Sequence, residues 1–137
     1  MIATGGTIAS KESAQGLVPS VSSHELLACV PEVEEACDVT AVQLFNLDST
    51  NVYAPHWLKI ACTVEENYDK YDGFVVTHGT DTMAYTAAAL SYLMQNIKKP
   101  VVLTGSQRSV YSRDTDARRN PVSYTHLRAH ETAAKIV

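Results

Sequence analysis

Short apolar runs alternate with segments of helical period along this chain, and their order predicts the fold. Residues 73–77 and 101–104 have the length and the β-branched composition of buried strands. Residues 40–47 alternate loosely and are bounded by polar turns, which also predicts a strand. Residues 82–96, rich in Ala and Leu, favour a helix between the last two runs. Strand, helix and strand with short joints predict a parallel pair and a right-handed crossover. We therefore expect a doubly wound α/β fold with a mostly parallel sheet.

The remaining segments predict two further helices and one loop. Ser22 and Glu25 have the spacing of a capping box, which predicts a short helix to about residue 30, ended by Pro31. Residues 55–71 place Trp57 and several other apolar side chains at helical spacing, which predicts an amphipathic helix. Residues 10–21 are rich in Ser, Gly, Gln and Pro without an apolar period, which predicts a mobile surface loop.

Composition and charge narrow the class of ligand. The 137 residues are 45% hydrophobic and 19% charged, which is ordinary for a soluble globular protein. We expect a cytoplasmic location. A net charge of −4 offers no basic surplus for nucleic acid, and no apolar run approaches the roughly 18 residues of a membrane span. Cys29, Cys37 and Cys62 lack the spacing of a metal site and are expected to be free, buried or half-buried thiols. A small neutral or zwitterionic ligand fits best.

Two threonine-centred turns carry the candidate chemistry. Thr-Gly-Gly-Thr-Ile-Ala-Ser occupies residues 4–10, and Thr-His-Gly-Thr-Asp-Thr occupies residues 77–82. Each turn belongs to or follows an apolar run, so it would present hydroxyls and backbone N–H groups at the carboxyl end of a strand. An amide hydrolase that uses threonine needs this arrangement, because a hydroxyl nucleophile requires a proton acceptor and nearby donors for the oxyanion.

These motifs, together with residues 16–19, 43–51 and 100–108, resemble the bacterial-type L-asparaginase family, also called the asparaginase/glutaminase family. The resemblance covers most of residues 1–120. It implies a two-domain, homo-oligomeric parent protein that hydrolyses L-asparagine to L-aspartate and ammonia, with no metal or organic cofactor.

The resemblance also assigns the site residues. It makes Thr7 the nucleophile and Thr80 the second essential hydroxyl, and it gives Asp81 the substrate α-amino group. Ser49 would bind the substrate carboxylate, with Thr50 at the neighbouring binding position. Each assignment has a plain structural alternative: these residue types are common in turns, and an acid near a helix N-terminus stabilises the helix dipole.

The chain departs from the family pattern in two places. Many members carry a tyrosine in the loop after the first threonine, whereas Leu17 stands at the nearest matching position here. The family's lysine partner of the second threonine lies downstream of these residues, and Lys98 and Lys99 precede the last strand at the wrong end of the sheet to replace it. We expect His78 to make a structural hydrogen bond at the end of its strand and not to act as a general base, because the family's mechanism does not depend on it.

We expect residues 1–121 to form an amino-terminal α/β domain that is incomplete at both ends. The first apolar run is short for a strand, and residues 122–137 do not continue the family pattern. Residues 123–132 instead resemble translated sequencing-adapter sequence, so we interpret this tail as artefactual. His126 and His130 are spaced like a metal pair but have no third ligand in a suitable motif.

Three alternatives to an asparaginase stay open. The parent could be the amidohydrolase subunit of a tRNA-dependent amidotransferase. The chain as written could be a fragment without activity, because it lacks the downstream lysine. A small module that binds an amino acid without hydrolysing an amide is the third.

Overall fold

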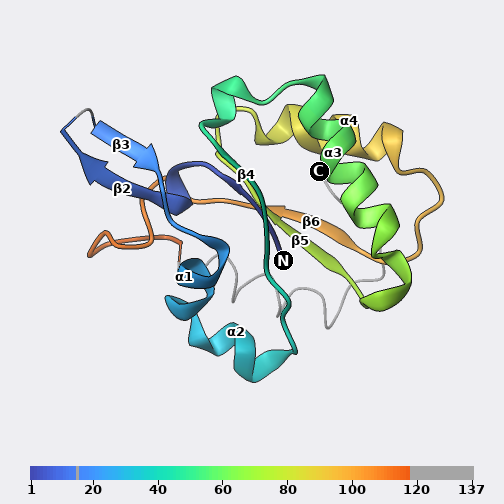
Figure 1. The fold of residues 1–137 in the computed structure, drawn as a ribbon, viewed down its shortest axis with the longest axis horizontal. Coiled ribbons are helices and arrows are strands. Elements are labelled where there is room, and N and C mark those ends of the chain that lie inside the picture. Colours follow the sequence, from blue (N-terminus) through green and yellow to red (C-terminus); the bar gives the residue numbers. More distant parts are fainter. Residues whose placement is uncertain (15, 118–137) are drawn as a thin grey trace.

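A four-stranded parallel sheet forms the centre of the computed structural model, which describes residues 1–14 and 16–117 (Figure 1). The strand order is β4-β1-β5-β6, so β1 lies between β4 and β5. The bounds are β1 (Ile2–Gly5), β4 (Val42–Leu47), β5 (Phe74–Thr77) and β6 (Val101–Thr104). The parallel α/β fold and the three expected strands are confirmed.

Helices cover both faces of this sheet (Figure 1). One pair is α1 (Ser23–Ala28) and α2 (Pro31–Ala36), and the other is α3 (Ala54–Glu66) and α4 (Met83–Leu93). The described residues also contain the short 3₁₀ helices η1 (Thr7–Ala9), η2 (Ser49–Asn51) and η3 (Tyr68–Lys70). The predicted capping box is present, because the Ser22 hydroxyl accepts from the Glu25 N–H while the Glu25 carboxylate accepts from the Ser22 N–H.

Residues 10–21 differ from the predicted loop. They contain an antiparallel hairpin of β2 (Ser10–Ser13) and β3 (Gly16–Pro19), which pairs Ser10 with Pro19 and Ser13 with Gly16. A hairpin outside the central sheet needs backbone pairing but no apolar face, so its sequence shows no clear alternation. Gly16, with φ of +102°, supplies the left-handed conformation that its turn requires.

Other sequence predictions also need correction. Pro31 was expected only to end the first helix, but it also begins a second helix, α2. In the first turn of a helix its missing N–H has no hydrogen-bond partner to lose. The helix expected to reach residue 71 ends at Glu66, and η3 follows it. Among the cysteines, Cys29 is half-buried as expected, but Cys37 and Cys62 are exposed.

The main core lies between the sheet and the pair α3 and α4. Seven buried side chains form it: Ile2, Ile60, Val64, Phe74, Val76, Leu90 and Val101. A second cluster joins α1 to the turn after β1 and to the segment after β6, and it contains Ile8, Ala9, Val21, Leu26, Val110 and Ala117. The turn after β1 is therefore held by its own apolar contacts.

We expect Ile60→Ala to lower the free energy of unfolding by about 2–5 kcal/mol, because Ile60 is fully buried in the main core. Leu58→Ala on the same helix is the matched control, since the Leu58 side chain is 52% exposed and its loss should change stability by no more than about 0.5 kcal/mol. Urea unfolding of the parent and both variants measures the difference. Equal costs at the two positions would contradict this placement of α3.

Candidate active site

The turns that follow β1, β4 and β5 meet at the carboxyl edge of the sheet. The chain leaves β1 toward α1 on one face and leaves β5 toward α4 on the other (Figure 1). This divergence between neighbouring strands is the position where open α/β sheets bind ligands. Thr7 lies in the turn after β1, Ser49 in the turn after β4, and Thr80 in the turn after β5.

The backbones of these three turns are in close contact. A Cβ atom built on Gly6 would overlap the backbone nitrogen and Cα of Gly79. A Cβ atom built on Gly79 would lie 2.6 Å from both Cβ and Oγ of Ser49, and 3.2 Å from Cα of Gly6. The residues immediately before Thr7 and Thr80 therefore touch, and Ser49 packs against them.

Hydrogen bonds fix this contact between strands. The Gly6 N–H donates to the carbonyl oxygen of Leu47 at 2.9 Å, which joins the turn after β1 to the end of β4. The Thr4 hydroxyl donates to the carbonyl oxygen of Thr77 at 2.7 Å, which joins β1 to β5. The Thr82 hydroxyl donates to the carbonyl oxygen of Ser49 at 2.7 Å. Each pair of turns is thus held by at least one polar link or backbone contact.

The predicted site residues differ in exposure. Ser49 is buried, Thr7 and Thr80 are half-buried, and Asp81 is exposed. Asp81 lies one residue before Thr82, the N-cap of α4, and so stands outside the first helical turn. The structure therefore brings Thr7, Ser49 and Thr80 into one neighbourhood, with Asp81 beside them in the β5–α4 turn.

Thr50 is hydrogen-bonded to a residue of its own turn. Its N–H and its hydroxyl donate to the Asp48 carboxylate at 2.9 and 2.7 Å, and Asp48 caps η2. These two hydrogen bonds hold the pKa of Asp48 below its usual value. The exposed Thr50 hydroxyl thus has a structural role in the turn after β4, next to the binding role predicted for it.

His78 is fully buried behind the β5 turn. Its Nδ1 lies 2.7 Å from the carbonyl oxygen of Gly79, and its Nε2 lies 3.0 Å from the Thr86 hydroxyl. Burial lowers the pKa of His78, and the contact with Gly79 opposes this in part. The expected structural hydrogen bond at this position is confirmed.

Sequence reasoning missed Thr82 and Thr86 of the β5–α4 segment. Thr86 interrupts the buried face of α4 one turn before Leu90, and a hydroxyl on an apolar helix face needs a buried polar partner. A threonine on an otherwise apolar helix face is therefore the sequence feature that could have identified Thr86. Lys98 and Lys99 precede β6 as expected, and the Lys99 ammonium donates to the carbonyl oxygen of Tyr68, away from the candidate site.

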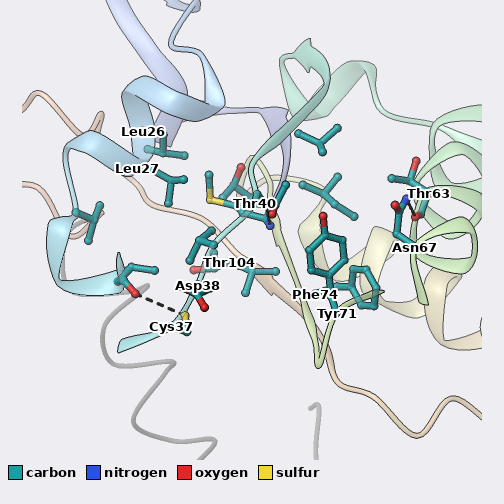
Figure 2. Close-up of a pocket in the computed structure, with 18 of the residues that line it drawn as sticks. Leu26, Leu27, Cys37, Asp38, Thr40, Thr63, Asn67, Tyr71, Phe74 and Thr104 are labelled. Atoms are coloured by element: carbon teal, nitrogen blue, oxygen red, sulfur yellow. Dashed lines mark hydrogen bonds between the residues drawn. The ribbon is translucent and has the colours of Figure 1, made fainter. Parts of the chain in front are cut away.

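A separate apolar cavity of about 180 Å³ lies between α1, α2 and the sheet (Figure 2). Leu26 and Leu27 line it from α1, and Tyr71 and Phe74 line it from the segment that leads into β5 (Figure 2). Thr7, Ser49, Thr80 and Asp81 are not among its lining residues. The candidate site is therefore the polar cluster at the sheet edge and not this cavity.

Residues 1–14 and 16–117 were compared with the requirements of a metal site and of a membrane-spanning helix, and they meet neither. Over these ranges, no three His, Cys, Asp or Glu side chains are grouped so that they could hold a metal ion. No helix in the same ranges combines the length and the apolar character needed to cross a bilayer.

Comparison with known proteins identifies the family. A family model described as "Asparaginase, N-terminal" matches residues 1–135. The chain belongs to the asparaginase family. The match includes both threonine turns, so the resemblance inferred from the motifs is confirmed.

Individual relatives carry two different names. A glutamyl-tRNA(Gln) amidotransferase subunit from Pyrococcus abyssi is 42% identical over 140 residues, covering 100% of this chain and 32% of that protein. The solved thermostable L-asparaginase from Thermococcus kodakarensis has a TM-score of 0.78 at 40% identity, covering 86% of this chain and 36% of the other. A structure described as a probable cytoplasmic L-asparaginase from Campylobacter jejuni has a TM-score of 0.77 at 33% identity, covering 92% and 38%. The chain spans about a third of the length of the curated relatives it matches.

The predicted tail lies outside the described residues. The family match extends to residue 135, so it does not separate residues 122–137, including His126 and His130, from the asparaginase domain. The artefactual origin of that segment and the boundary at residue 121 stay predictions.

We expect the contact between Gly79 and Ser49 to appear as energetic coupling. Gly79→Ala should destabilise the chain by about 1–3 kcal/mol, because its new methyl group has no room beside the Ser49 side chain. Ser49→Gly removes both crowding atoms, so Gly79→Ala should cost less in that background, with a coupling of at least about 0.5 kcal/mol. Urea unfolding of the four chains in this double-mutant cycle measures the coupling. Additive costs would contradict the contact.

Proposed function

We propose that the full-length gene product hydrolyses the side-chain amide of L-asparagine to give L-aspartate and ammonia. Thr7 is the nucleophile and Thr80 the second essential hydroxyl. The observation that carries this proposal is the contact between Gly6 and Gly79, which brings the turns that hold the two threonines together at the sheet edge. Membership of the asparaginase family supports the reaction class.

The reaction would proceed in two halves. The Thr7 oxygen adds to the amide carbon as its proton passes to an acceptor, and the tetrahedral intermediate then expels ammonia after the leaving nitrogen gains a proton. Water releases L-aspartate from the acyl-enzyme and restores the Thr7 hydroxyl. Thr7 is half-buried in the turn at the carboxyl edge of the sheet, where a small substrate could reach it.

Substrate binding would use the neighbouring polar groups. Asp81, a carboxylate beside Thr80, would bind the substrate α-ammonium, since an ion pair with hydrogen bonds is the strong form of that contact. Ser49, which packs against Gly79, would bind the substrate carboxylate, and Thr50 would support it from the same turn. No metal or organic cofactor enters this scheme, and we propose a cytoplasmic homo-oligomer as the working form.

A second candidate is an amidotransferase component that releases ammonia for transfer to glutamyl-tRNA(Gln). Several relatives named as glutamyl-tRNA(Gln) amidotransferase subunits match the whole chain at 39–43% identity, which is as high as the identity of the L-asparaginases. Ammonia release from L-asparagine by the purified gene product alone favours the asparaginase. Ammonia release that needs a partner protein and glutamyl-tRNA(Gln) favours the amidotransferase.

We expect Thr7→Ala and Thr80→Ala in the full-length gene product to lower kcat by about 10³-fold or more each, because each change removes a hydroxyl that acts in the transition state. Thr7→Ser and Thr80→Ser are the matched controls, since they keep the hydroxyl and should retain more activity than the alanine variants. Steady-state ammonia release from L-asparagine measures this. Activity within about threefold of the parent for either alanine variant would remove that residue from the proposed role.

We expect Asp81→Asn to act mainly on substrate binding, because it removes the charge that pairs with the α-ammonium. The loss should be about 1.5–3 kcal/mol, seen as a raised KM for L-asparagine with a smaller change in kcat. An unchanged KM together with normal kcat would leave Asp81 as a residue of the turn without a binding role.

A further inference from the structure

Three side chains from different elements form a buried chain of hydrogen bonds behind the β5 turn. Nε1 of Trp57, on α3, lies 3.0 Å from the Thr86 hydroxyl on α4. The same hydroxyl lies 3.0 Å from Nε2 of His78, and Nδ1 of His78 lies 2.7 Å from the carbonyl oxygen of Gly79. His78 and Thr86 are fully buried, and Trp57 is half-buried.

The chemistry of the two ends fixes the direction of every bond. A carbonyl oxygen can only accept, so Nδ1 of His78 carries the proton and donates to Gly79. In the neutral ring Nε2 must then accept, and the Thr86 hydroxyl donates to it. The indole nitrogen of Trp57 can only donate, so the Thr86 oxygen accepts from it. Donation runs from Trp57 through Thr86 and His78 to Gly79 without conflict.

The last acceptor connects this chain to the candidate site. The Gly79 carbonyl belongs to the peptide that joins Gly79 to Thr80, and this peptide is trans because the described residues contain no cis bond. In a trans peptide the C=O and N–H groups point in opposite directions. Holding the Gly79 oxygen toward the buried His78 ring therefore sets the plane of the peptide and directs the Thr80 N–H away from that ring.

The two residues that precede Thr80 are also restrained. Gly79 touches Ser49 and Gly6, and the His78 N–H donates to the carbonyl oxygen of Thr104 at 2.8 Å. The chain from Trp57 to Gly79 supplies the restraint on the side of α3 and α4. Neither ring nitrogen of His78 is left over for proton transfer with a substrate.

We propose that His78, Thr86 and Trp57 are positioning residues for Thr80: a directional chain of hydrogen bonds holds the Gly79–Thr80 peptide in the orientation that the reaction requires. This inference rests on the proposed function, because it assigns Thr80 a part in the reaction. The three residues do not touch substrate in this scheme, and their effect reaches it through the peptide.

The test compares Thr86→Val and Thr86→Ser in the full-length gene product. Valine keeps the shape of threonine but cannot accept from Trp57 or donate to His78, so we expect kcat for L-asparagine to fall about tenfold or more while KM changes less than about threefold. Serine keeps the hydroxyl and should restore kcat to within about threefold of the parent. Thr63→Val is the matched control, because that helical hydroxyl donates to the Lys59 carbonyl of its own helix, and its kcat should not change.

Two kinetic results would overturn the proposal. One is a folded Thr86→Val protein with kcat within about twofold of the parent, and the other is an equal loss in Thr86→Val and Thr86→Ser. Melting temperatures of all variants establish that they are folded. If Thr86→Val does not fold, Trp57→Phe takes its place, since it removes the indole N–H donor at the start of the chain, together with one ring, and leaves Thr86 and His78 unchanged. A folded Trp57→Phe protein should lose kcat in the same direction, and unchanged kcat would contradict the chain.

A second readout separates this inference from the proposed function. Long-range ¹H–¹⁵N spectra report which ring nitrogen of a histidine carries the proton, and the His78→Asn variant assigns the signal. We expect an Nδ1–H ring in the parent and the same tautomer in Thr86→Val with a shifted Nε2 signal, because Gly79 still accepts from Nδ1 while Nε2 loses its hydrogen-bond donor. A parent that releases no ammonia contradicts the proposed function, whereas an Nε2–H ring in the same sample overturns the hydrogen-bond chain. An Nδ1–H ring in that sample still supports the chain as a restraint on the peptide.

Discussion

The two consecutive glycines after β1 are the constraint on which the site depends. Gly5, with φ of +103°, lies against the backbone of Leu47 at the end of β4. Gly6, with φ of +80°, lies against Gly79 after β5 on the opposite side. Because β1 is the strand between β4 and β5, a side chain at either position would push one neighbouring strand away from it. The turn that holds Thr7 fits between the end of β4 and the turn after β5 only because the two residues before Thr7 lack a Cβ.

Local sequence predicts those parts of the fold whose energetics are local. The strand at Val101–Thr104 and the Ser22 capping box were predicted with their residues, since buried β-branched runs and caps have specific short patterns. The hairpin at residues 10–19 was missed, because its backbone pairing places few demands on side chains. The end of α3 was placed five residues too far along, since the apolar spacing continues through Tyr68 although the helix stops at Glu66.

The sequence predicts which residues of the site follow a strand, but not how these residues contact one another. Thr7, Ser49 and Thr80 follow three strands that prove to be neighbours, so their convergence follows from the parallel topology. The contacts between them could not be predicted, because they depend on the order β4-β1-β5, in which the first strand lies in the middle. The hydrogen bond between Thr50 and Asp48 is local and could have been inferred, since an Asp side chain in a turn often accepts from the backbone N–H two residues further along.

Helix α4 links the core to this edge of the sheet. Thr82 and Thr86 are four residues apart and so share a face of the helix, where one hydroxyl binds the turn after β4 and the other binds His78 after β5. Leu90, one turn further along the same face, packs in the core with Ile60 and Val64 of α3. The apolar contacts of Leu90 therefore hold in place the helix that carries Thr86 and that Thr82 precedes. The geometry of two polar turns at the sheet edge is thus determined in part by hydrophobic packing between two helices, one of which also carries Trp57.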